Sequence, residues 1–70
     1  MTFEECCEAI LLDRANPALN YAVGYATAGR TMTGHAAKVQ ALYILNNSSR
    51  WRGDVAREVR ASLKEIGGLK

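Results

Sequence analysis

The sequence contains few of the residues on which catalytic and metal sites are usually built. His35 is its single histidine, and its two cysteines, Cys6 and Cys7, are adjacent. No pair of carboxylates stands at a recognisable spacing from His35, and a zinc site needs separated pairs of ligands and a fourth ligand that this chain lacks. We therefore predict that the protein is not an enzyme and has no catalytic residue, metal site or cofactor.

The two cysteines are poorly placed to form a disulfide with each other. Neighbouring side chains on a helix point about 100° apart, which does not suit the geometry of a bridge. Two free thiols are typical of a reducing compartment, where Cys6 and Cys7 would act as small core hydrophobes. The alternative is a thiol-redox protein, which requires an exposed cysteine with a low pKa.

The sequence also has no segment typical of a membrane span, a secretory signal or a phosphate-binding loop. No apolar run approaches the length of about 20 residues that crosses a bilayer. Glu4, Glu5 and Glu8 stand where a secretory signal would be positive. We expect a cytoplasmic protein with no membrane contact. Its 70 residues predict a single helical domain, 1–70, near the smallest size at which a hydrophobic core is stable alone.

Helical periodicity and helix-end signals predict an all-α fold, a small bundle of three to four helices. The predicted helices cover Phe3 to Asp13, Pro17 to Ala28, His35 to Asn47 and Asp54 to Ile66. Thr2 and Glu5 match a capping box, and Asn16-Pro17 is a typical helix start. The last helix has an apolar stripe at positions i, i+4, i+8 and i+11, made of Val55, Val59, Leu63 and Ile66.

The helix over residues 35–47 is predicted to be the central, buried helix of the bundle. Val39 and Tyr43 project on one side of it and Ile44 and Leu45 on the other. A helix that is apolar nearly all round is normally covered by neighbours on more than one side.

Charge is distributed unevenly along the chain. Residues 1–29 hold four acidic and one basic residue, whereas residues 30–70 hold eight basic and three acidic residues. The two parts could neutralise each other within the fold, or the basic part could form a face for a partner.

The basic part gives the alternative function of nucleic-acid binding. Its candidate residues are Arg50, Trp51, Arg52, Arg57, Arg60 and Lys64. The cations would contact phosphates, and Trp51 would either stack on a base or fold back as a plug on the core.

Tyr21 and Tyr25 are the candidate partner-binding residues. They lie one helical turn apart, beside the small residues Gly24 and Ala28. The first helix could cover them. If they are exposed, they form an aromatic patch of the kind enriched at protein interfaces.

Residues 42–64 contain three short segments that resemble those of other proteins. They read Leu-Tyr-Ile-Leu-Asn-Asn, then Trp-Arg-Gly, then Val-Ala-Arg-Glu-Val-Arg-Ala-Ser-Leu-Lys. This resembles short uncharacterised proteins encoded by tailed bacteriophages, and it implies an accessory protein acting on a host or viral partner. The predicted function is therefore a non-catalytic helical interaction module that binds a protein partner or forms a homodimer.

Overall fold

Helices account for all the regular secondary structure that the computed structural model describes, which covers residues 1–69. They are α1 (Phe3–Leu12), the 3-10 helix η1 (Pro17–Leu19), α2 (Ala22–Gly29), α3 (Gly34–Asn46) and α4 (Asp54–Ile66). The predicted all-α bundle is confirmed. Within residues 1–69, no helix has the length and apolar character that a bilayer crossing requires.

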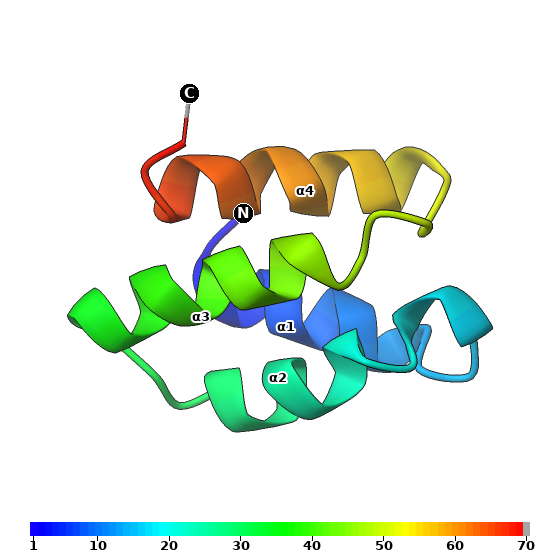
Figure 1. Ribbon diagram of the computed structural model, residues 1–70, viewed down its shortest axis with the longest axis horizontal. Coiled ribbons are helices and arrows are strands. Elements are labelled where there is room, and N and C mark those ends of the chain that lie inside the picture. The colour runs from blue at the N-terminus through cyan, green and yellow to red at the C-terminus, as the bar shows by residue number, and fades with distance from the viewer. Residues whose placement is uncertain (70) are drawn as a thin grey trace.

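The four α-helices form a ring in which each packs against two others. Helix α1 contacts α2 and α4, and α3 contacts the same two helices. In Figure 1, α4 runs along the top, α2 along the bottom, and α3 lies between them in front of α1. The core contains fully buried side chains from every helix, including Ile10, Leu19, Ile44 and Leu63.

Helix α1 begins at the predicted capping box. The Glu5 amide donates to Thr2 Oγ1 at 3.1 Å, and the Thr2 amide donates to Glu5 Oε1 at 2.8 Å. This backbone hydrogen bond lowers the pKa of Glu5, because it stabilises the carboxylate. Cys6, Cys7 and Ile10 form the buried face of the helix.

The single helix predicted over Pro17 to Ala28 is divided into two. Pro17–Leu19 is a 3-10 helix capped by Asn16, whose Oδ1 accepts from the Ala18 amide at 3.0 Å. This tighter helix ends at Leu19 and α2 begins at Ala22, and both residues are fully buried. The apolar pattern of the sequence is compatible with either geometry, so the break was not predicted.

The helix predicted over residues 35–47 is α3, which has the expected neighbours on more than one side, α2 and α4, but its surface is not buried all round. In α3 the buried residues are Ala37, Gln40, Ala41 and Ile44, which form one stripe. The opposite side is open, with Tyr43 at 48% exposure, because α3 has neighbouring helices on two sides only within the described residues. Gln40 is satisfied by donating from Nε2 to the Tyr25 carbonyl at 2.9 Å.

Helix α4 has the predicted bounds, but its buried stripe is displaced at its start. Val59 and Leu63 are fully buried, whereas Val55 is 55% exposed and Ala56 takes the expected core position. At the other end, Gly68 has a φ of +83°. The Leu69 amide donates to the Lys64 carbonyl at 2.8 Å. This is a Schellman ending, which favours glycine at the left-handed position.

Candidate interaction surface

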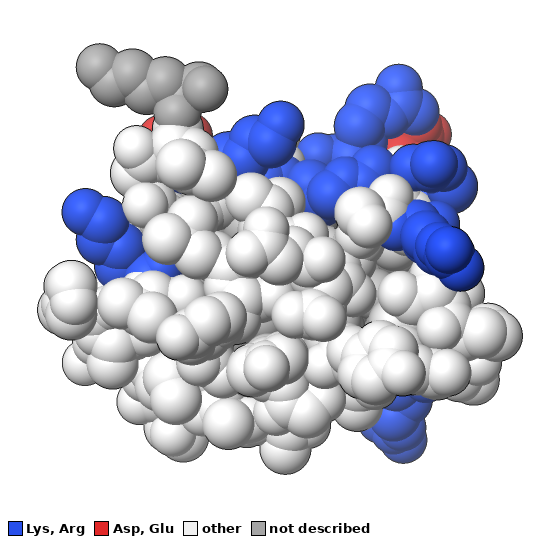
Figure 2. Space-filling view, in the orientation of Figure 1, with Lys and Arg blue, Asp and Glu red and all other residues white. Residues whose placement is uncertain are grey.

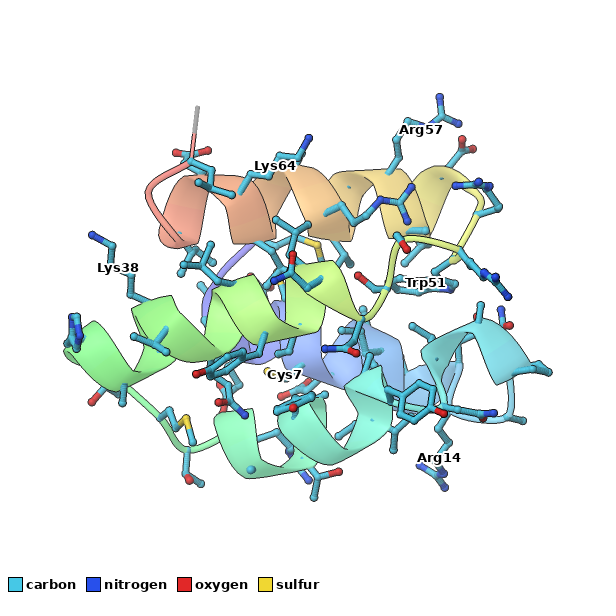
Figure 3. All side chains as sticks on the ribbon, in the orientation of Figure 1. Cys7, Arg14, Lys38, Trp51, Arg57 and Lys64 are labelled. Carbon is cyan, nitrogen blue, oxygen red and sulfur yellow. The ribbon has the colours of Figure 1, made fainter. Side chains whose placement is uncertain are left out.

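The loop between α3 and α4 is fixed by Trp51. Its ring is 2% exposed and packs in the core, and its Nε1 donates to Asp13 Oδ2 at 2.9 Å. Asn16 Nδ2 donates to the same oxygen at 3.1 Å. In Figure 3 the ring lies beneath the start of α4. Trp51 is therefore the predicted plug, and its buried ring is not presented for stacking on a base.

Arg60 also supports this loop. Its Nη1 donates to the Ser48 carbonyl at 3.2 Å and to the Trp51 carbonyl. The side chain is half-buried, so these bonds bring the loop backbone against α4. Arg60 therefore has a structural role that the charge pattern of the sequence did not reveal.

The other basic candidates are exposed. Arg50, Arg52, Arg57 and Lys64 all reach solvent. Together with Arg60 they form the cationic edge, which lies over α4 and the preceding loop at the top of Figure 2. Figure 3 shows Arg57 and Lys64 pointing away from the bundle.

The acidic first helix does not neutralise this edge through direct pairs. The only ion pair among residues 1–69 joins Arg57 Nη2 to Asp54 Oδ1 at 2.9 Å, within α4 itself. Its side chains are 75% and 98% exposed, so it is worth at most about 1 kcal/mol. The carboxylate that pairs with the cationic edge is therefore that of Asp54 on α4 and not one from α1.

The structure gives different surroundings to the two tyrosines that the sequence places together. Tyr25 is 38% exposed and stacks on Tyr43 of α3, with ring centroids 5.6 Å apart and an interplanar angle of 23°. Tyr21 precedes α2 and is 78% exposed. Neither is covered by α1. Tyr43 was not predicted as a partner-binding residue, because its proximity to Tyr25 depends on how α2 and α3 pack.

The Tyr25–Tyr43 stack belongs to an uncharged surface. Val39 and Ala36 lie one and two turns before Tyr43 on the same side of α3; Ala36 is exposed and Val39 is partly exposed. We name these four residues the tyrosine face. In Figure 2 the surface over α2 and α3 is white across its middle, with lysine and arginine restricted to its margins.

Tyr21 lies instead in a groove beside the cationic edge. The groove has a volume of about 340 Å³ and is lined by residues that include Pro17, Tyr21, Asn46, Asn47 and Arg50. We name it the Tyr21 groove. It joins the turn before α2 to the end of α3, segments that are distant in sequence, and no local motif pointed to it.

A second groove, of about 360 Å³, lies between the end of α1 and the start of α4. Leu12, 89% exposed, and Val55, 55% exposed, line it. It contains the largest exposed aliphatic groups of these two helices and is the rival to the tyrosine face as an apolar contact surface.

The two thiols do not meet the requirements of a redox site. Cys6 and Cys7 are fully buried and unbridged. Burial raises the pKa of Cys6, and it raises the pKa of Cys7 to about 11. The buried thiol, and not the reactive thiolate, is thus the stable form. Among the described residues, no three histidine, cysteine, aspartate or glutamate side chains are grouped to hold a metal ion.

No family model, curated protein or solved structure matches this chain.

Proposed function

We propose that the protein is a non-catalytic interaction module that associates with a second copy of itself through the tyrosine face. The observation that carries this proposal is the exposed stack of Tyr25 on Tyr43, in a surface without charged groups. Tyrosine provides a large apolar contact area together with a polar tip, and it is enriched where proteins bind one another.

The charge distribution of the surface favours a second copy of the chain as the partner that binds the tyrosine face. In a two-fold dimer each surface meets its own equivalent, so a charged patch would oppose like charge. The cationic edge would repel itself in such an arrangement, whereas the uncharged tyrosine face would not. A core built from 70 residues also gains stability when additional apolar surface is buried by association.

Sedimentation equilibrium tests this proposal directly. We expect a reversible monomer–dimer equilibrium with a dissociation constant in the range of about 1 μM to 1 mM. Tyr43→Glu, which would bury two carboxylates in the dimer, should leave the protein monomeric across that range. Far-UV circular dichroism should remain that of the parent, because Tyr43 is 48% exposed.

Val55→Glu is the matched control. Val55 is exposed to a similar extent, 55%, but lies in the rival groove on another side of the bundle. It should dimerise like the parent. A parent protein that is monomeric at about 1 mM would overturn the proposal. Loss of the dimer in Val55→Glu with retention in Tyr43→Glu would assign the interface to the rival groove instead.

The thiol-redox alternative, the location and the bacteriophage role are separate from the proposed self-association. The raised pKa and full burial of the cysteines count against thiol-redox chemistry. A cytoplasmic location stays a prediction, as does the accessory bacteriophage role implied by residues 42–64.

A further inference from the structure

The Tyr21 groove presents a flat ring beside free cationic donors. Tyr21 is 78% exposed, so most of its ring can contact a ligand without any change in the core. The groove is also lined by Asn46, Asn47 and Arg50. Amide and guanidinium groups offer hydrogen bonds to the polar edge of a planar ring that stacks on the tyrosine.

The charges around the groove favour a polyanion. Arg50 lines it, is exposed, and makes no hydrogen bond or ion pair within residues 1–69. Arg52, two residues further along the chain, lines the second groove and not this one, and it donates one bond, from Nη1 to the Ser49 carbonyl at 3.0 Å. Since a guanidinium has five donor hydrogens, most of them remain for a ligand. None of the residues that line the groove is acidic.

We propose that the Tyr21 groove binds single-stranded nucleic acid, with an unpaired base stacked on Tyr21 and the adjoining phosphates on Arg50 and Arg52. Single-strand binding sites commonly combine an aromatic platform with cations that follow the backbone. A duplex keeps its bases paired and stacked, so it cannot offer one to the tyrosine. The aromatic partner of the cations is thus Tyr21, since Trp51 is buried.

This inference goes beyond self-association and uses residues outside the tyrosine face. The test is fluorescence anisotropy of a labelled oligothymidine of about 12 nucleotides, a length within the usual site sizes. We expect saturable binding at low salt that weakens as salt rises, with a log–log slope of about −0.7 for each phosphate contacted. Duplex DNA of the same length should bind more weakly.

The Tyr21 variants separate stacking from charge. Tyr21→Ala should weaken binding roughly 5- to 150-fold, the loss expected for one stacked base. Tyr21→Phe keeps the ring and should bind nearly as well as the parent. Both variants should fold and self-associate as the parent does, because Tyr21 is largely exposed and is not a member of the Tyr25–Tyr43 stack.

Arg50→Gln and Lys38→Gln form a matched pair, since each removes one positive charge. Lys38 lies near the start of α3, about 12 Å along the helix from Asn46, and Figure 3 shows it at the opposite end of the molecule from Trp51. Arg50→Gln should weaken binding and make the salt slope shallower, while Lys38→Gln should have little effect.

Four results would overturn the inference. They are no binding at low salt, equal losses in Arg50→Gln and Lys38→Gln, undiminished binding by Tyr21→Ala, and polyglutamate binding as tight as that of the oligonucleotide. Self-association is measured separately on each variant by sedimentation, so failure of this inference and failure of the dimer are distinguishable.

Discussion

Leu63 and Leu12 are the same residue type in opposite environments, and replacing each by alanine tests the core directly. Leu63 of α4 is fully buried, whereas Leu12 at the end of α1 is 89% exposed. The buried leucine loses three carbon atoms, worth about 0.8 kcal/mol each. A residual cavity of about 50 Å³ would add roughly 1 kcal/mol. Leu63→Ala should therefore destabilise the protein by about 3 to 4 kcal/mol.

That loss is large for a chain of 70 residues, whose total stability is expected to be about 4 to 10 kcal/mol. The free energy of unfolding can be measured by urea denaturation, followed by circular dichroism at a fixed protein concentration. Leu12→Ala should change it by less than about 0.5 kcal/mol. A Leu63→Ala protein that melts cooperatively within a few degrees of the parent, or a Leu12→Ala protein as destabilised as Leu63→Ala, would refute the core assignment.

Three further predictions concern Arg60 and the cysteines. Arg60→Ala should lower the free energy of unfolding by about 1 to 3 kcal/mol, because it removes the bonds to the loop carbonyls. Arg57→Ala should lower it by less than about 1 kcal/mol. Equal effects of the two substitutions in urea denaturation would contradict the structural role of Arg60. Cys6 and Cys7 should react with a thiol reagent only as fast as the protein opens, and rapid labelling under native conditions would contradict their burial. The pKa of Cys7 is raised to about 11 from an ordinary 9.0. Its contribution to the free energy of unfolding should therefore be complete below pH 9 and decline towards pH 11. A protein that becomes more stable between pH 9 and pH 11 would contradict this assignment.

The sequence was most informative where a local pattern determines the structure. The Thr2–Glu5 capping box and the bounds of α4 follow from residues within a few positions of one another. The role of Trp51 as a plug was also predicted, since a large apolar ring between two helices favours the core. Its hydrogen-bond partner was not predicted, because Asp13 lies 38 residues away.

Prediction failed where packing between helices decides the outcome. The apolar surround of α3 predicted a central, buried helix with neighbours on more than one side. Helix α3 packs against α2 and α4, but the side that carries Tyr43 is left in solvent. The same packing brings Tyr43 to Tyr25 and Tyr21 towards Arg50. Both candidate contact surfaces thus consist of residues that only the fold brings together.

The ring arrangement of the helices also bears on the order in which the protein folds. Three of its packed pairs join helices that follow one another in the chain, and the remaining pair joins α1 to α4. Cys6 and Val59, which meet across that last contact, are 53 residues apart. Bringing distant segments together has an entropic cost that nearby segments avoid, so local pairs are expected to assemble first. The Trp51–Asp13 hydrogen bond then connects the segments that are the last to meet, and its loss would weaken the contact between α1 and α4 while the pairs of successive helices stay packed.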